Sequence, residues 1–244
     1  MNVTAIMATC GRHFCCERSL SLFLNQCYEK KHLLIYQNSE VAQSINPCID
    51  LKLVTLVNNC IDSETNEPYK NLGAIYRDAI KYIPAETDLI TFWDDDDIFV
   101  RDHIDQGVNG IRRGGKIAYK PKFSYHYDGY SITRQRNNFE PSIFVKLRHV
   151  LEYGFSDSTI DQHLKWLNPL IRMDQLYIDE NGKSTLVYNW GDRFYTYKTS
   201  QRTTEPDCFQ TYRQKSTQHG DRLISPMDIS TMMEKIENLI AKAD

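Results

Sequence analysis

The chain has 244 residues, a net charge of −3 at pH 7 and a pI near 6.2. This length is enough for one large domain with a complete core, and the balanced charge excludes a globally polycationic protein. No apolar run reaches the roughly 18 residues that a membrane-spanning helix needs. Seven scattered cysteines without a CxxC pair, and an N-terminus that reads as a strand and not as a signal peptide, predict a protein of the reducing cytoplasm.

Strand and helix patterns alternate in the first half of the chain. Short apolar runs predict buried strands at residues 3–9, 32–36, 51–57 and 89–93. Helical spacing of apolar side chains predicts helices at residues 14–27, 71–83 and about 100–113. This alternation predicts a mostly parallel α/β sheet, in which ligands bind at the carboxyl ends of the strands. We therefore expect Thr9, Gln37, Asn38 and the acidic run after the fourth strand to line one crevice.

The second half has a different pattern. Short strands are predicted at 116–119, 122–127, 130–134 and 142–145, with Asp128-Gly129 as a hairpin turn. A helix is predicted at 158–167, and strands at 176–178 and 185–188 flank a second hairpin signal at 180–183. Residues 191–226 are polar and irregular. A final helix, with a capping box from Thr231 to Glu234, is expected to pack on the domain.

Four consecutive aspartates, Asp94 to Asp97, follow the strand at 89–93. Such carboxylates repel one another and raise one another's pKa values unless a positive charge lies among them. In an extended segment Asp94 and Asp96 project to the same side, which suits a hard divalent cation with oxygen ligands. The alternative is a solvated acidic loop in which Asp97 caps the next helix.

Five segments in this order resemble the family 2 glycosyltransferases of the GT-A fold, over about residues 2–170. The first strand ends in Thr9, as in that family. The segment Ser19 to Tyr28 is similar to the family's SlxxQtY helix, and Asn71 to Asp78 is similar to its NxGxaxarN segment. Phe92 to Asp97 stands where the family carries its DXD motif. The last similar pieces are Gly154-Phe155 and Asp161 to Leu164.

The resemblance implies a mixed, mostly parallel sheet flanked by helices, with a small antiparallel region on the acceptor side. It predicts a single GT-A domain at residues 1–225, with a nucleotide-sugar half at 1–113 and an acceptor half at 114–190. Residues 226–244 form the C-terminal helix. The implied reaction transfers a sugar from a nucleoside-diphosphate donor, by resemblance UDP-linked, to a hydroxyl group.

The resemblance also implies residue roles. Asp94 and Asp96 hold Mn²⁺ or Mg²⁺, and Asp161 is the general base of an inverting displacement, with Asp157 as the alternative base. Arg12 and Arg77 are candidates for the diphosphate, as cations near strand ends. The remaining nucleotide-sugar contacts are expected from Thr9, Gln37, Asn38, Asn71, Asp94 and Asp95.

Two departures from the family pattern stand out. The acidic pair that often holds the uridine is replaced by Gln37-Asn38, whose amides can still bond a base edge. The family's C-terminal metal-binding histidine has no clear counterpart, and Asp192 or His219 are the possible substitutes.

The acceptor is suggested by residues 112–148. This segment holds nine Lys or Arg and two acids, a local charge of +7, interleaved with aromatic side chains. Basic and aromatic residues together suit a phosphate-bearing polymer or a flipped base. Hydroxymethylated cytosine in DNA, as in virus-encoded modification, is slightly favoured over a cell-surface or lipid-linked glycan. The protein would then act in a bacterial cytoplasm or in that of a virus's host. A metal-dependent nuclease or phosphatase and a silent nucleotide-binding module are the alternatives from other classes.

Overall fold

A seven-stranded sheet forms the centre of the protein. The computed structural model describes residues 1–138, 140–189 and 222–243. Across the sheet the strands are β11 (Leu176–Asp179), β7 (Ala118–Pro121), β10 (Phe144–Lys146), β5 (Leu89–Phe92), β1 (Val3–Thr9), β2 (Lys31–Gln37) and β4 (Val54–Asn58). β10 runs antiparallel to both of its neighbours, and the other pairs are parallel. The predicted mostly parallel α/β sheet is therefore confirmed.

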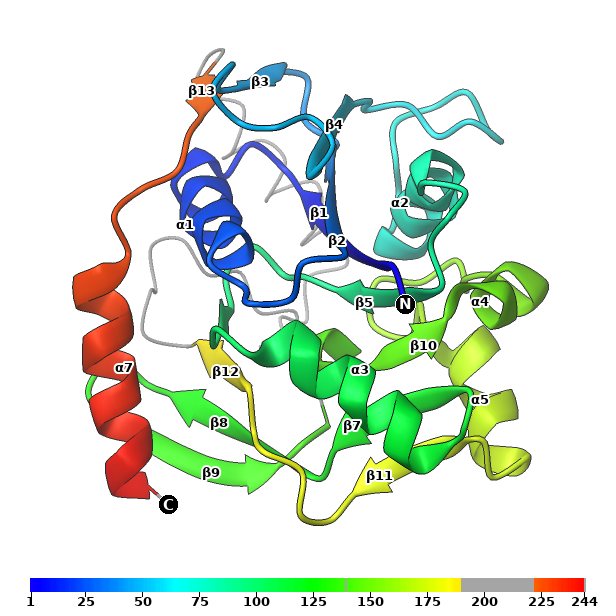
Figure 1. The fold of residues 1–244 in the computed structure, drawn as a ribbon. Coiled ribbons are helices and arrows are strands. Elements are labelled where there is room, and N and C mark those ends of the chain that lie inside the picture. The colour runs from blue at the N-terminus through cyan, green and yellow to red at the C-terminus, as the bar shows by residue number, and fades with distance from the viewer. Residues whose placement is uncertain (139, 190–221, 244) are drawn as a thin grey trace.

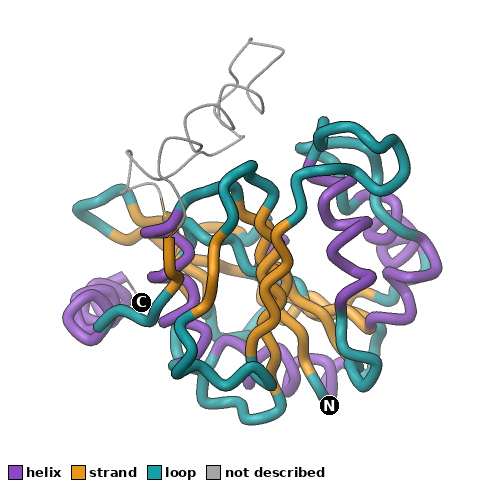
Figure 2. Tube along the Cα trace, turned by 90° about the horizontal axis from the view of Figure 1, so that it is seen from above, coloured by secondary structure: helices purple, strands orange, loops and turns teal. Residues whose placement is uncertain are grey.

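Helices cover both faces of this sheet (Figures 1 and 2). Alternate residues of a strand point to opposite faces, so Ala5 and Met7 of β1 enter one core cluster and Ile6 enters the other. The first cluster includes side chains of α1 (His13–Leu24), α3 (His103–Gly114) and α7 (Ser230–Ala243). The second includes α2 (Leu72–Ala79), α4 (Leu147–Tyr153) and α5 (Leu164–Arg172). A 3₁₀ turn, Ile80–Tyr82, extends α2.

A smaller sheet lies beside the central one. Its strands, in order, are β6 (Ile98–Phe99), β12 (Leu186–Asn189), β8 (Phe123–Tyr127) and β9 (Ile132–Arg136). β8 and β9 form the predicted hairpin around Asp128-Gly129, where Gly129 adopts a φ of 99°. Figure 1 shows α7 alongside this sheet, with Met233 and Ile236 buried against it. A two-stranded pair, β3 (Gln43–Ile45) and β13 (Arg222–Ile224), completes the described strands.

Two predictions for the second half are wrong, one about strand pairing and one about the start of a helix. β11 and β12 do not form a hairpin, because β11 pairs with β7 while β12 pairs with β6 and β8. The helix predicted at 158–167 begins only at Leu164. The Ser158 hydroxyl accepts the amides of Ile160 and Asp161, at 3.2 and 3.0 Å, and closes a turn that competes with the helix.

Other differences concern element ends. The C-terminal helix starts at Ser230, so Thr231 lies inside it, and the Asp228 carboxylate accepts the Ser230 amide at 2.9 Å. α4 and the short strands β6, β3 and β13 were not predicted.

Most of the irregular segment expected at 191–226 lies outside the described residues, as do Asp192 and His219. In the described part of the chain no helix is both long and apolar enough to cross a bilayer.

Candidate active site

The four aspartates form a tight turn at the carboxyl end of β5. The Asp97 amide donates to the Asp94 carbonyl at 3.4 Å, so the segment is not extended as predicted. The turn brings one carboxylate oxygen from each of Asp94, Asp96 and Asp97 within 4.8 Å of one another. Asp94 and Asp96 are therefore gathered as predicted, and Asp97 joins them because the chain turns. Asp97 does not cap α3, which starts at His103.

Asp95 points away from this group into the protein. Its carboxylate accepts the Thr9 hydroxyl at 2.6 Å and is paired with the Arg12 guanidinium. Complete burial raises the pKa of Asp95 to about 6, although Arg12 and the Thr9 hydrogen bond oppose that rise. Thr9 therefore connects the end of β1 to the acidic turn, and its part in donor binding stays a prediction.

Two arginines next to the turn reduce its negative charge. Arg12 pairs with Asp96 at 3.1 Å as well as with Asp95. Arg18, buried on α1, donates to the backbone carbonyl of Asp96 at 3.0 Å. The acidic turn is consequently held at a fixed place by α1 and by the loop that precedes it. Arg12 lies at the predicted site, but here its guanidinium pairs with carboxylates.

Asn189, the last residue of β12, clamps the turn from the other side. Its amide donates to Asp97 Oδ1 at 3.0 Å, and its side chain donates to the Asp96 carbonyl at 3.0 Å. This residue was not predicted, because nothing local connects it to aspartates that lie more than ninety positions earlier. Its one signal in the sequence was its place three residues before Asp192, a substitute named above for the family's metal-binding histidine.

The chemistry of this donor set fits a hard divalent cation. Such ions take several carboxylate oxygens at about 2.0–2.6 Å, and the three gathered carboxylates offer them from one side. Asp96 and Asp97 are buried while Asp94 is partly exposed, so a cation here would face both the protein and a bound ligand. Asp94, Asp96 and Asp97 are the residues that would hold it.

The ends of β1 and β2 meet next to this turn. The Asn38 amide donates to the Thr9 carbonyl at 2.9 Å. Gln37 is buried, accepts the Gly11 amide at 3.0 Å and donates to the Ser39 hydroxyl at 2.7 Å. The Gln37 amide group thus orders the loops after both strands. Its predicted contact with a nucleobase stays a prediction, as does that of Asn38.

The residues predicted on α2 have structural partners. Asn71 caps the helix, accepting the Ala74 amide at 2.8 Å. Arg77 forms ion pairs with Asp62, Glu64 and Asp157. Asp157, the alternative base, is therefore bound to an arginine, and both arginine and aspartate lie in one ionic cluster.

Asp161 lies in the exposed turn before α5. Aromatic packing fixes the position of this turn relative to β5. Phe155 stacks on Tyr76 at 5.4 Å between ring centroids, and His163 contacts Phe92, two residues before Asp94, at 4.3 Å. The loop that carries Asp161 is thereby packed next to the carboxyl end of β5.

Glu140 is a further acidic residue of this edge that the sequence analysis did not single out. In the antiparallel pairing of β10 with β5, Phe144 is opposite Thr91, so the preceding 3₁₀ turn, Glu140–Ser142, lies near the start of the aspartate turn. Burial raises the pKa of Glu140, Lys120 lowers it and the charge of Asp161 raises it further. Its one signal in the sequence was being an isolated acid within a basic segment.

Among the comparisons with known proteins, the one with solved structures finds similar folds. No protein-family model and no curated protein matches the sequence. The structure is similar to S. aureus TarS in complex with UDP-GlcNAc, with a TM-score of 0.58 and 11% identity, covering 100% of this chain and 71% of that chain. A TarS complex with UDP gives a TM-score of 0.57 and 11% identity, covering 78% and 60%. Against a longer TarS structure the TM-score is 0.56 at 12% identity, covering 78% of this chain and 37% of that chain.

These likenesses confirm the predicted architecture, a GT-A-type mixed α/β fold with a C-terminal helix. The chain spans between 37% and 71% of the length of the TarS chains that it matches. TM-scores of 0.56 and 0.58 show a common fold, and at 11–12% identity they show no more than the fold, so the activity is argued from the site itself.

Proposed function

We propose that this protein is a metal-dependent glycosyltransferase that transfers a sugar from a UDP-linked donor to a hydroxyl group, with inversion at the anomeric carbon. The observation that carries the proposal is the set of three carboxylates at the end of β5, packed next to the loop of Asp161. The TarS structures of the same fold contain UDP and UDP-GlcNAc, which supports a UDP-sugar donor.

The donor half of the reaction requires charge stabilisation, because the diphosphate gains negative charge as the glycosidic bond breaks. Mn²⁺ or Mg²⁺ bound to Asp94, Asp96 and Asp97 would supply it as a Lewis acid. Arg12 reaches the same turn through its ion pairs with Asp95 and Asp96. Thr9 and Asn38 stand at the neighbouring strand ends, where we place the nucleoside.

The acceptor half requires a base. Asp161 is exposed, in the turn that the contact of His163 with Phe92 packs next to the carboxyl end of β5. A single carboxylate that removes the proton of the attacking hydroxyl implies direct displacement and therefore inversion. Glu140, in the 3₁₀ turn next to the start of the aspartate turn, is suited to hydrogen-bond another hydroxyl of the acceptor.

For the acceptor class, the structure reduces the support for DNA. Three cations of the segment 112–148, namely Arg113, Lys116 and Lys122, are paired with carboxylates of residues 174–180. Of the other cations, Arg134 and Arg136 lie on β9 at the exposed edge of the smaller sheet, and Arg112 and Arg148 are exposed elsewhere on the surface. We therefore propose a glycan hydroxyl as the acceptor and keep hydroxymethylated cytosine in DNA as the second candidate.

The first test is donor turnover without an acceptor. The protein is incubated with UDP-GlcNAc and Mn²⁺, and release of UDP is measured with and without a chelator. We expect slow hydrolysis that depends on the metal. The variant Asp128→Asn, which changes an exposed acid of the β8–β9 turn, should match the wild type. Absence of both UDP binding and UDP release would contradict the proposal, and cleavage of DNA or of a phosphomonoester under the same conditions would favour the nuclease or phosphatase alternative.

A further inference from the structure

Arg77 is the centre of an ionic cluster on α2. Its guanidinium is 3.1 Å from both carboxylate oxygens of Asp62, 3.0 Å from Glu64 and 2.6 Å from Asp157. The Asp62 side chain is 8% exposed and anchors the guanidinium on the protein side, whereas the Asp157 side chain is 65% exposed. Three carboxylates thus surround one positive charge, which disfavours the approach of a further anion such as a diphosphate.

Asp157 belongs to the loop of residues 154–163, which carries Asp161. The start of α2 contacts the same loop through its backbone. The Gly73 amide donates to the Ser158 carbonyl at 3.0 Å, and a Cβ at Gly73 would lie 1.7 Å from the Ser156 carbonyl oxygen. The loop therefore rests directly on α2, at a distance that only glycine allows.

The two ends of the loop are fixed by Phe155 and His163, which pack on Tyr76 and Phe92. Between these contacts, residues 157–161 form the outer part of the loop. Asp157 is the side chain through which this outer part is tied to Arg77. It lies four residues before Asp161, so the ion pair limits how far the carboxylate of Asp161 can move.

We propose that Arg77 is a positioning residue that holds the loop of Asp161 through Asp157, and not a ligand of the donor diphosphate. This inference rests on the proposed function, since it assigns Asp161 as the base. Catalytic geometry is sensitive to such support, because a displacement of about 1 Å at a reacting group can lower a rate about 100-fold. The ion pair with Asp62 fixes the orientation of the Arg77 guanidinium, and the ion pair with Asp157 holds the loop against that guanidinium.

The experiment compares Asp157→Asn with Glu64→Gln. Both changes remove one carboxylate from the same guanidinium, but only Asp157 belongs to the loop, and Glu64 is 59% exposed. With UDP-GlcNAc and Mn²⁺, Asp157→Asn should lower kcat for UDP release by about 10-fold and leave KM for the donor unchanged. Glu64→Gln should change neither value. Hydrogen exchange of the amides of residues 154–163 should speed up only in Asp157→Asn.

The variants Arg77→Ala and Arg77→Lys separate positioning from diphosphate binding. Positioning predicts a lower kcat with an unchanged affinity for UDP, measured by calorimetry. A UDP affinity that falls about 10-fold or more in Arg77→Ala, with Asp157→Asn silent, would overturn the inference. Arg77→Lys keeps the charge but not the three nitrogens that contact Asp62, Glu64 and Asp157, and should recover only part of kcat.

The double variant Arg77→Ala/Asp157→Asn tests whether Asp157 positions the loop through Arg77 or is itself the general base. If Asp157 acts through Arg77, the double variant is no slower than Arg77→Ala, within about twofold. If Asp157 is itself the base, Asp157→Asn alone loses about 10²–10⁴-fold and exceeds Arg77→Ala, which refutes the inference. A wild-type protein without UDP binding or UDP release would refute the proposed function instead. In that case unchanged hydrogen exchange of the amides of residues 154–163 in Asp157→Asn would still contradict the positioning role of the Arg77–Asp157 pair.

Discussion

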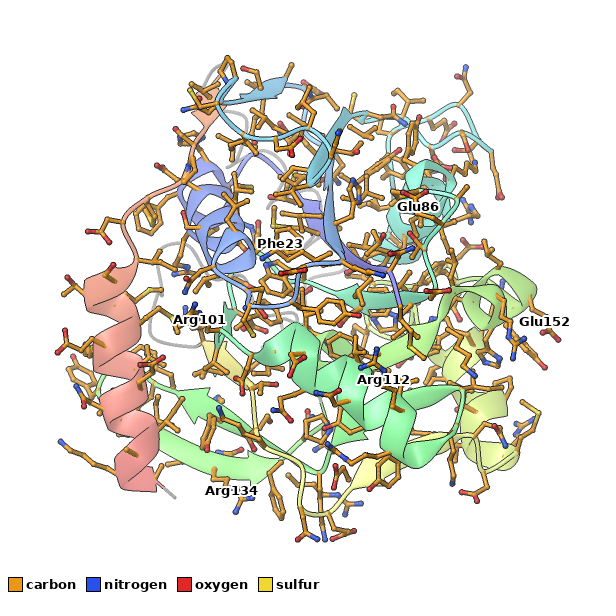
Figure 3. The ribbon with its side chains drawn as sticks, viewed as in Figure 1. Phe23, Glu86, Arg101, Arg112, Arg134 and Glu152 are labelled. Atoms are coloured by element: carbon orange, nitrogen blue, oxygen red, sulfur yellow. The ribbon has the colours of Figure 1, made fainter. Side chains whose placement is uncertain are left out.

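Two charged regions were predicted to be functional, and they differ in how the fold arranges their charges. The aspartate turn concentrates four acids at one strand end, and three of their carboxylates lie within 4.8 Å of one another. The cations of the basic segment 112–148 are spread over α3, β7, β9, β10, α4 and the loops between them, and these strands belong to two different sheets. In Figure 3, Arg112 of α3 is well separated from Arg134 of β9, which lies at the lower edge of the molecule. Charge density along a chain therefore indicates a site only when the residues cannot be separated by folding.

The partners of the two regions differ as well. The acidic turn is held by Arg12, Arg18 and Asn189, which come from distant parts of the chain and converge on it. In the basic segment, Arg113 pairs with Asp179 and Lys122 with Glu180, near the surface. Asp179 is buried, whereas Glu180 is exposed, so the Lys122–Glu180 pair contributes little stability, on the order of 0–1 kcal/mol. Both pairs lower the local positive potential.

The largest expected effect is on the acidic turn. Asp96→Asn removes one of the gathered carboxylates and should lower metal-dependent release of UDP from UDP-GlcNAc by about 10²–10³-fold, which corresponds to the loss of a positioned charge stabiliser. The rate is measured across a Mn²⁺ titration. Removal of a cation from the other region, Arg134→Gln, should leave the rate unchanged. An Asp96→Asn protein with the wild-type rate would mean that this turn does not bind the metal.

The next effect concerns the stability of the turn. Thr9→Val removes the hydroxyl that donates to buried Asp95 at 2.6 Å, and should lower the free energy of unfolding by about 1–3 kcal/mol. Urea denaturation at pH 7 measures the change. Thr4→Val is a matched control on the same strand, because Thr4 bonds only the neutral hydroxyl of Thr87. Equal losses in both variants would show that the carboxylate of Asp95 does not depend on Thr9.

A pH effect of moderate size is expected from the core beside the turn. Burial lowers the pKa of His103 to about 3, and this imidazole packs on Trp93 and Phe99. The unfolded chain binds a proton near pH 6.5 and the folded chain does not, so stability is lost as pH falls below about 6.5. Between pH 7.5 and 5.5 the loss is on the order of 1 kcal/mol for this histidine.

The control for this effect is His103→Asn, which retains a polar group toward the Thr185 hydroxyl. Its stability should fall less than that of the wild type over the same pH range. Asp95 acts in the opposite direction, because its raised pKa of about 6 makes protonation favourable in the folded state as pH falls toward 4. The comparison of the two proteins isolates the histidine, and parallel pH profiles would contradict the prediction.

The smallest effect is expected for DNA. Because its cations are dispersed and partly paired, the segment 112–148 should give no binding to hydroxymethylated duplex DNA at about 0.15 M salt. Arg134→Gln/Arg136→Gln should then change nothing in a filter-binding or anisotropy assay. DNA would be restored as the preferred acceptor if the wild type bound it and each removed arginine changed the salt dependence. The magnitude of the slope of log K against log salt concentration would then fall by about one for each arginine removed.

The sequence alone determined the features that depend on neighbours along the chain. The apolar runs of β1, β2 and β5 are short, β-branched or aromatic, and no helical pattern competes with them, so their positions were predicted to within a residue or two. Asp94 and Asp96 were identified because four adjacent acids after a buried strand stay together in any fold. The hairpin of β8 and β9 was predicted for the same reason, since its turn residues are contiguous.

Only the tertiary structure decided which distant segments meet. β11 and β12 look like a hairpin locally, yet β11 pairs with β7 and β12 pairs with β6 and β8, in two different sheets. The clamp of Asn189 on Asp97, the placement of Glu140 and the three carboxylates around Arg77 all follow from strand order and loop packing. These contacts join residues far apart in the chain, so their formation depends on burial summed over the whole core and leaves no local pattern to detect.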